Sequence, residues 1–155
     1  MTDTTEHQCS CPCGESQFTF TGKPIARFIC HCKICQKLYN KPFADVLMFK
    51  TKNITMTKQD KVEFKKYRLP PALNRGVCDA CHQPVIGFLP GFGLAFASAD
   101  KVKDQSILPE PLFHSFYHRR VDDFPDHLPK YSGYWPSTWA VSVQFLKHTF
   151  GLKTH

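Results

Sequence analysis

The chain has 155 residues, of which 42% are hydrophobic and 21% are charged, and its net charge is +7 with neutral histidines. This length predicts one domain, large enough to bury about two thirds of its surface. No run approaches the eighteen or so uninterrupted apolar residues of a membrane span. Residues 1–7 are polar and lack the apolar centre of a signal peptide. We therefore expect a soluble, cytoplasmic protein without membrane contact.

The positive charge would suit an anionic partner, which could be a nucleic acid, a membrane surface or a small acidic metabolite. Its distribution does not favour nucleic acid. The lysines of residues 33–66 are mixed with acids and no arginine-rich arm accompanies them. Lys58, Lys61, Lys65 and Lys66 could form a local patch, but a solvated face is the simpler interpretation.

The predicted elements are mostly short strands. Segments 17–21, 44–49, 62–67 and 95–97 are rich in β-branched or aromatic residues and are bounded by Gly, Pro or Asn, which is typical of strands. A helical turn is expected at 34–38, where it would let Cys32 and Cys35 face one metal ion. Twelve prolines and eight glycines argue against long helices. The sequence therefore predicts a mainly β fold.

The C-terminal segment 132–155 is unusually apolar, and its periodicity is ambiguous. Val141, Val143 and Phe145 alternate as in a strand, whereas Trp139, Val143, Leu146 and Phe150 have helical spacing. We expect this segment to pack on the domain or to form an interface between copies, so that a homodimer is one possible outcome.

The eight cysteines form three tight groups, and this grouping is the strongest functional signal in the sequence. Zinc binds thiolates at about 2.3 Å in a tetrahedron, so cysteines one or two residues apart can share one ion. The first and last groups together could complete a closed, structural four-sulfur site, and the middle group would hold a second zinc with an open, catalytic position. The proposed structural ligands are Cys11, Cys13, Cys78 and Cys81, and the proposed catalytic ligands are Cys30, Cys32 and Cys35.

The cysteines also allow three other interpretations. Four disulfides would require an oxidising compartment, for which no signal peptide is seen. The run from Cys78 to His82 matches a haem-attachment motif, but attachment there would leave Cys11 and Cys13 without partners. Cys30, Cys32 and Cys35 could also be buried or redox-active thiols without a metal.

The sequence resembles the glutathione-dependent formaldehyde-activating enzyme family, which includes centromere protein V. The resemblance covers about residues 9–131. It is carried by Cys11-Pro12-Cys13-Gly14, by residues 30–37 (CHCKICQK), by residues 78–81 (CDAC) and by residues 114–131, including His114-Ser115-Phe116-Tyr117. It implies a zinc-pinned β-tent of short antiparallel strands related to methionine sulfoxide reductase B, and it implies the same division of the cysteines between two zincs.

The resulting domain plan has a flexible N-terminus at 1–8, a zinc-binding domain at 9–131 and the apolar extension at 132–155. Three features depart from the family pattern: Cys9, His82 and the turn at 40–42. Cys9 is expected to be a spare thiol, although it could exchange with Cys11 as a ligand. His82 could occupy a left-handed position, which histidine adopts more readily than most residues.

The implied activity is carbon–sulfur lyase chemistry, in which glutathione adds to formaldehyde to give S-hydroxymethylglutathione, or the reverse. His31 or His114 is predicted to move the proton, because imidazole titrates near neutral pH. Either ring could instead be only packed and hydrogen-bonded. Lysines or Arg120 near the site would attract the anionic tripeptide. The phenylalanines considered for a pocket are Phe43, Phe88, Phe92 and Phe96.

Two alternatives remain open at this point. One is a non-catalytic binding module with two structural zincs and an acidic partner, which a filled fourth position on the middle zinc would favour. Cys9, His31 or a distant histidine could supply that ligand. The other is a lyase of the same fold with a different substrate. A methionine sulfoxide reductase is not favoured, because no cysteine follows Cys81.

Overall fold

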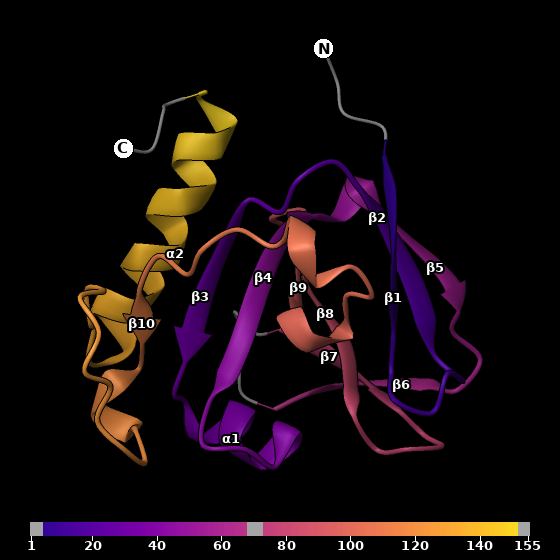
Figure 1. The fold of residues 1–155 in the computed structure, drawn as a ribbon, viewed down its shortest axis with the longest axis horizontal. Coiled ribbons are helices and arrows are strands. Elements are labelled where there is room, and N and C mark those ends of the chain that lie inside the picture. The colour runs from indigo at the N-terminus through magenta and orange to yellow at the C-terminus, as the bar shows by residue number, and fades with distance from the viewer. Residues whose placement is uncertain (1–4, 68–72, 152–155) are drawn as a thin grey trace.

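The fold is given by a computed structural model, which describes residues 5–67 and 73–151. It contains two sheets and two α-helices (Figure 1). The three-stranded sheet has the order β1-β2-β5, and the seven-stranded sheet has the order β10-β3-β4-β9-β8-β7-β6. The strands are β1 Glu6–Ser10, β2 Gln17–Thr21, β3 Ala26–Cys30, β4 Ala44–Lys50, β5 Ile54–Lys58, β6 Val62–Lys66, β7 Asn74–Cys78, β8 Pro84–Leu89, β9 Leu94–Ser98 and β10 His114–Ser115. The α-helices are α1 Lys33–Tyr39 and α2 Tyr134–Thr149, and short 3-10 turns lie at Thr51–Asn53, Ala99–Lys101, Gln105–Ile107 and Tyr117–Arg119.

The mainly β fold predicted from the sequence is confirmed. All strand pairs between named strands are antiparallel except β10 with β3, which is parallel. The strand predicted at 17–21 is β2, residue for residue, and the other three predicted strands match β4, β6 and β9 within one residue at each end. The helical turn predicted at 34–38 lies inside α1.

Strand β4 separates two hydrophobic cores, because successive side chains of a strand point to opposite faces. Leu47 and Phe49 pack in the first core, together with Phe18 of β2 and other residues of the small sheet. Val46 and Met48 face the second core, which also contains the middle cysteine group and residues of both helices. The two faces of the large sheet thus carry two separate environments, and each contains one of the expected cysteine sites.

The ends of the chain differ in part from the predicted domain plan. Residues 6–8, expected in a flexible terminus, pair with β2, where Glu6 lies opposite Thr21. The apolar C-terminal segment is a helix, α2, which lies beside β10 at one end of the large sheet (Figure 1). Ser137 and Ala140 are its buried residues, whereas Trp135 and Trp139 are 78% and 65% exposed. The helical spacing was therefore the informative pattern, and the alternation of Val141, Val143 and Phe145 was coincidental.

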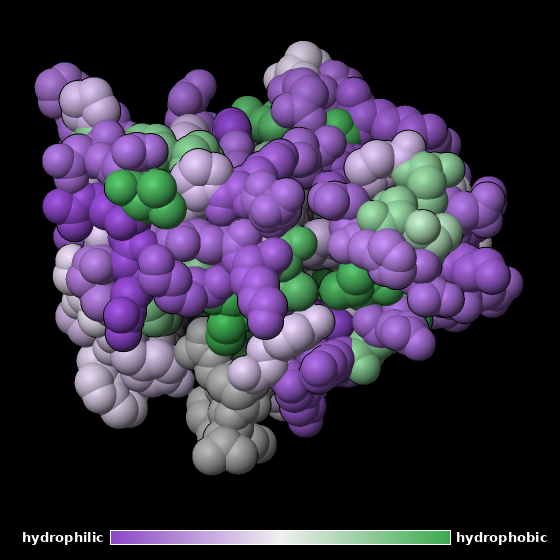
Figure 2. Space-filling model, turned by 90° about the horizontal axis from the view of Figure 1, so that it is seen from below, coloured by the Kyte–Doolittle hydropathy of each residue, from purple (hydrophilic) through white to green (hydrophobic). Residues whose placement is uncertain are grey.

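Seen from below, hydrophobic side chains surface in small groups among predominantly hydrophilic ones (Figure 2). Neither of the described α-helices is long and apolar enough to cross a membrane.

Candidate metal centres and active site

The first cysteine group brings together two turns that are far apart in sequence. Cys11 and Cys13 follow β1, while Cys78 ends β7 and Cys81 lies in the turn before β8. The Sγ atoms of Cys11 and Cys13 are 3.4 Å apart, and those of Cys13 and Cys78 are 3.7 Å apart. A tetrahedron with zinc–sulfur bonds of 2.3 Å has edges of about 3.8 Å. The four sulfurs, which all lie within 4.8 Å of one another, could therefore hold one metal ion.

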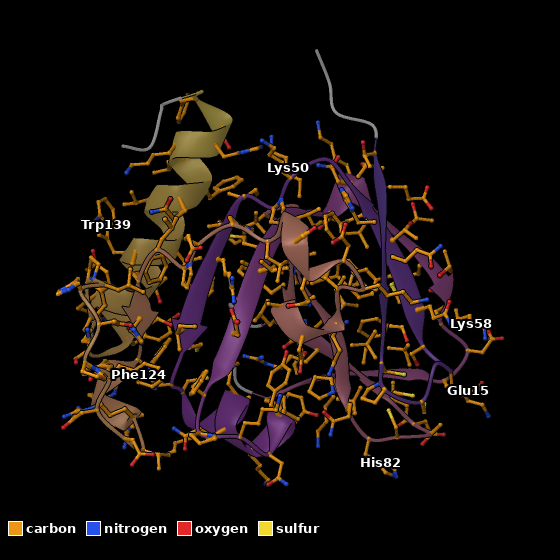
Figure 3. The ribbon with its side chains drawn as sticks, in the orientation of Figure 1. Glu15, Lys50, Lys58, His82, Phe124 and Trp139 are labelled. Carbon is orange, nitrogen blue, oxygen red and sulfur yellow. The ribbon has the colours of Figure 1, made fainter. Side chains whose placement is uncertain are left out.

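The turn between β7 and β8 shows how the sequence builds half of this site. The N–H of His82 donates to the carbonyl of Cys78 at 2.7 Å, and His82 has a φ of 60°, in the left-handed region suggested by its place in the motif. Desolvation alone would raise the pKa of Cys78, but hydrogen bonds that include the N–H groups of Ala80 and Cys81 lower it to about 6. The environment of Cys78 thus favours the thiolate, the form that binds a metal. Its sulfur atoms lie near the labelled Glu15 and His82 in Figure 3.

The second cysteine group lies at the junction of β3 and α1. Cys30 ends β3, Cys32 is the N-cap of α1 and Cys35 lies in its first turn. All three are buried, and their sulfurs also lie within 4.8 Å of one another, with Cys30 and Cys35 3.7 Å apart. The N–H of Cys35 donates to Sγ of Cys32 at 3.3 Å, as expected for a helix N-cap. These three sulfurs could hold a second metal ion.

Charge in this group is concentrated on Cys32. Hydrogen bonds from Cys30 and Cys35 lower the pKa of Cys32 to about 2, and the charge of Arg75 acts in the same direction. Arg75, on β7, approaches Sγ of Cys35 with its Nη1 at 3.9 Å. Sequence reasoning missed Arg75, because it belongs to no motif and lies 40 residues from Cys35. Its guanidinium offsets the negative charge that a three-thiolate site carries.

Cys9 and His31, the named candidates for a fourth ligand of the second cysteine group, both make their contacts away from it. Cys9 lies in the first core, where burial raises its pKa to about 12, and it belongs to neither sulfur group. His31 follows Cys30 directly, but its Nε2 lies 2.9 Å from Nδ1 of His114. Among the described residues, the second group therefore contains three ligand atoms and no histidine or carboxylate.

His31 and His114 are both buried, and their chain of hydrogen bonds ends on the exposed Asp126. Nε2 of His114 lies 2.7 Å from Oδ2 of Asp126, and Lys130 donates to Oδ1 of Asp126 at 2.6 Å. Because an ionised carboxylate only accepts, His114 donates to Asp126 through Nε2–H. Lys130 and His114 lower the pKa of Asp126 to about 2. Desolvation lowers the pKa of His31 to about 4, so its ring is neutral at physiological pH.

Aromatic rings enclose this histidine pair. Phe124 lies edge-on to His31, with centroids 5.3 Å apart, and contacts His114 at 4.8 Å. Phe124 belongs to the segment after β10, beside the large sheet (Figure 3). Phe43 also packs here, 6.0 Å from His31, and not in a pocket as considered from the sequence. The pair thus occupies its own closed environment.

A cavity of about 440 Å³ adjoins the second cysteine group, and Cys30, Cys32 and Cys35 form part of its wall. The remaining wall comes from β3, β4, β7, β8, β9, both helices and neighbouring segments. Phe92 and Phe96 line it, as considered from the sequence, whereas Phe88 packs against the first core. Neither His31 nor His114 is among the lining residues.

Arg120, expected to attract an anionic substrate, lies away from this cavity. It pairs with Asp123, and its guanidinium lies over the ring of Tyr117, 4.4 Å from the centroid. Apart from the cysteine thiolates, the one charged side chain among the described lining residues is Arg75. The structure therefore places a cation at the sulfur group itself and not at the expected position.

Comparison with known proteins agrees with this geometry. A family model described as glutathione-dependent formaldehyde-activating enzyme matches residues 6–112, which include both cysteine groups. No curated protein sequence matches the chain. A crystal structure of a protein from Rhodobacter sphaeroides has a TM-score of 0.53 and 10% sequence identity, covering 67% of this chain and 96% of that chain. At this identity the likeness concerns the fold alone.

Proposed function

Because the chain belongs to the glutathione-dependent formaldehyde-activating enzyme family, we propose that it is a zinc-dependent carbon–sulfur lyase acting on a thiol–aldehyde adduct. The observation that carries the proposal is the contrast between the two cysteine groups. Four sulfurs can close one coordination shell completely, whereas three sulfurs on a cavity wall leave room for a fourth ligand from the substrate. We assign the first group to a structural zinc and the second to a catalytic zinc.

The donor set of the second group suits a soft substrate ligand. Zinc held by three thiolates would supply a position where a substrate thiol binds as its thiolate, while activating water less than a zinc held by neutral histidines does. The protein's own residues prepare this position. Cys32 is held as a thiolate by its neighbours, Arg75 balances the charge, and the buried location limits access of water.

The reaction needs only one proton transfer. When a thiol adds to formaldehyde, a carbon–sulfur bond forms, the carbonyl π electrons move to oxygen, and the oxygen takes up the proton released by the thiol. The hydroxymethyl thioether contains all atoms of both reactants, and the reverse reaction breaks the same carbon–sulfur bond. No oxidant or reductant is required.

The proton-transfer role of His31 or His114 stays a prediction. Their contacts support a positioning role as well, because the pair connects the cysteine segment to β10 and to Asp126. Gln36 strengthens the same connection by donating to the carbonyls of His31 at 2.7 Å and Arg119 at 2.8 Å. These bonds fix the backbone between Cys30 and Cys32.

Exchange NMR would test the proposed activity. In a mixture of glutathione and formaldehyde at equilibrium, the zinc-loaded protein should accelerate exchange between free formaldehyde and S-hydroxymethylglutathione. The Cys32→Ser variant should lose this acceleration, and Cys9→Ala should keep it, because Cys9 lies in neither sulfur group. Equal exchange with wild type, with Cys32→Ser and without protein would refute lyase activity on this pair.

We also propose a cytoplasmic location and a homodimer. The exposed indoles of Trp135 and Trp139 on α2 support the dimer, since Trp139 points away from the sheets (Figure 3). Light scattering of wild type and Trp139→Arg would test it, because a dimer through this face should dissociate in the variant.

A further inference from the structure

Two hydrogen-bond donors lie on the wall of the cavity that also contains the second cysteine group. They are the guanidinium of Arg75 and the hydroxyl of Tyr39, and they share this wall with Cys30, Cys32 and Cys35. Arg75 comes from β7, whereas Tyr39 is the last residue of α1, the helix that Cys32 caps. The cavity volume of about 440 Å³ lies within the range of small-molecule sites, about 300–1,000 Å³. A small substrate held at the three sulfurs would therefore share the cavity with both donors.

The guanidinium of Arg75 lies next to the sulfurs. Its Nη1 is 3.9 Å from Sγ of Cys35. Burial alone would lower the pKa of Arg75, but the negative charges of Cys35 and Cys32 raise it above its usual value. A guanidinium carries five N–H donors in a planar fork, and the contact with Cys35 uses one nitrogen of that fork. Arg75 can therefore also donate to an anionic oxygen placed beside the sulfurs.

The hydroxyl of Tyr39 acts from the other side of the sequence motif. Its ring packs in the second core, four residues after Cys35. Burial raises the pKa of Tyr39, the charge of Cys35 acts in the same direction, and the charge of Arg75 opposes them. The hydroxyl therefore keeps its proton at neutral pH and lies within electrostatic reach of both groups. A protonated phenol is a donor suited to an oxygen that gains negative charge.

The proposed reaction creates such an oxygen. When the thiol sulfur forms a bond to the aldehyde carbon, the carbonyl π electrons move to oxygen, which then takes up the proton that the thiol released. The reverse reaction passes through the same negatively charged oxygen. Only one carbon atom separates sulfur from oxygen in the adduct, so the oxygen stays close to the sulfur group. Donors fixed at that place stabilise the developing charge, and they do so most strongly where water is excluded.

We propose that the Arg75 guanidinium and the Tyr39 hydroxyl form an oxyanion site, in which both donate hydrogen bonds to the substrate oxygen while the carbon–sulfur bond forms or breaks. This inference rests on the proposed function for the position of the substrate sulfur at Cys30, Cys32 and Cys35. It concerns only the S–CH₂–O end of the adduct, so it is the same for glutathione and for any other thiol. Arg75 then serves the substrate as well as the charge of the cysteines.

A pair of small ligands tests the oxyanion site by binding alone. Thioacetate carries sulfur and oxygen on one carbon, as the adduct does, and ethanethiol has the same skeleton without the oxygen. In isothermal titration calorimetry of the zinc-loaded full chain, Tyr39→Phe should weaken thioacetate binding about tenfold or more, the effect expected for a hydrogen bond to a charged group. It should change ethanethiol binding less than twofold. Equal effects on the two ligands would overturn the proposal.

A matched tyrosine controls for changes in the cavity wall. Tyr67 also lines the cavity, but it is exposed and lies beside Lys65, whose Nζ is 5.4 Å from its ring centroid. In the exchange NMR experiment, Tyr39→Phe should lower the maximal exchange rate about 100-fold, the typical effect of losing one oxyanion donor. Tyr67→Phe should stay within twofold of wild type. Equal rates for the two variants would contradict the role of Tyr39.

Arg75→Lys tests the second donor, because lysine keeps the positive charge but lacks the planar fork. This variant should retain both zincs and still bind thioacetate at least about tenfold more weakly than wild type does. Unchanged thioacetate binding with both zincs retained would remove Arg75 from the oxyanion site.

The two readouts separate this inference from the proposed function. If wild type fails to accelerate exchange while Tyr39→Phe still weakens thioacetate selectively, the oxyanion site is supported and lyase activity on this pair fails. If wild type accelerates exchange and Tyr39→Phe is equally fast, lyase activity stands and the oxyanion site is overturned.

Discussion

Nε2 of His31 lies 2.9 Å from Nδ1 of His114, although the two residues are 83 positions apart in the sequence. The contact joins the segment after β3 to β10, the strand that runs parallel to β3 in the large sheet. Both rings are buried, with 1% and 0% of their surface exposed. This hydrogen bond would hold the rings in place whether they transfer a proton or only stabilise the fold. An experiment must therefore separate the two roles.

His114→Ala should destabilise the protein by about 2–4 kcal/mol, because it removes the hydrogen-bond partner of His31 and opens a cavity at a buried site. Urea unfolding of the metal-loaded protein measures this change. The matched control is His127→Ala, since His127 is exposed and should change stability by less than about 0.5 kcal/mol. A loss of activity without a loss of stability in His114→Ala would instead support proton transfer.

The pH dependence of stability should reveal the neutral state of His31. Its pKa is about 4 in the folded protein against 6.5 for an unperturbed histidine, so the unfolded chain binds more protons between these values. Stability should therefore fall as the pH is lowered from about 6.5 to about 4. The control is His31→Gln, whose stability should depend less steeply on pH in this window. Because both proteins release metal in acid, the difference between them isolates the histidine, and identical slopes would contradict the assignment.

The alternation of side chains explains why His31 faces away from the cysteine site, although the sequence suggested that it could lie beside the metal. Cys30, His31 and Cys32 follow one another on extended backbone, in which neighbouring side chains point to opposite sides. The two cysteines therefore reach one site and the histidine faces away from it, toward His114. The spacing of the cysteines already contained this information, and applying the two-residue period to the motif would have shown it.

Other parts of the site depended on contacts that no local pattern encodes. The membership of each cysteine group could be predicted, because two or three ligands of each come from a single turn. Arg75 could not be predicted, since it reaches Cys35 through the pairing of β7 in the large sheet.

The strands β3 and β7 were missed for a related reason: Arg27 and Gly76 interrupt their apolar pattern. Arg27 forms an ion pair with Asp45 of the neighbouring strand β4, and Gly76 leaves room for Val62 and Phe64 of β6.

The two metal sites should differ in their effect on the fold. Cys78→Ser should lose one zinc and destabilise the protein strongly, because this site joins the turn after β1 to the turn after β7. Cys32→Ser should also lose one zinc but keep a cooperative thermal transition, because β3 and α1 remain connected by the chain. Metal analysis and calorimetry measure both effects. The control Cys9→Ala should retain two zincs, and retention of two by Cys32→Ser would contradict the second site.

Arg75→Met should weaken zinc binding at the three-sulfur group. The charge of Arg75 lowers the pKa of Cys32, so its removal makes the thiolate less favourable and more easily protonated. Neighbours of metal ligands typically change affinity by about 10–100-fold, and competition with a chromophoric chelator would measure this. Lys65→Met is the matched control, because Lys65 lies opposite Arg75 in the β6–β7 pair but is exposed. Equal chelator competition by the two variants would show that Arg75 does not support the site.

Ser137 should prove more important to stability than its small side chain suggests. Its hydroxyl is fully buried and bonds the N–H of Phe116 and the carbonyl of Tyr131, which ties α2 to the segment around β10. Phe116 has a φ of 53°, a conformation that costs about 1–3 kcal/mol in a bulky residue and persists only where surrounding contacts hold it. Ser137→Ala should therefore lower stability by about 1–3 kcal/mol in urea unfolding.

Ser142→Ala is the control. It removes only a bond to the carbonyl four residues earlier in the same helix, so it should lower stability by less than about 0.5 kcal/mol. If the two serine variants are equally stable, the hydroxyl of Ser137 does not hold this connection.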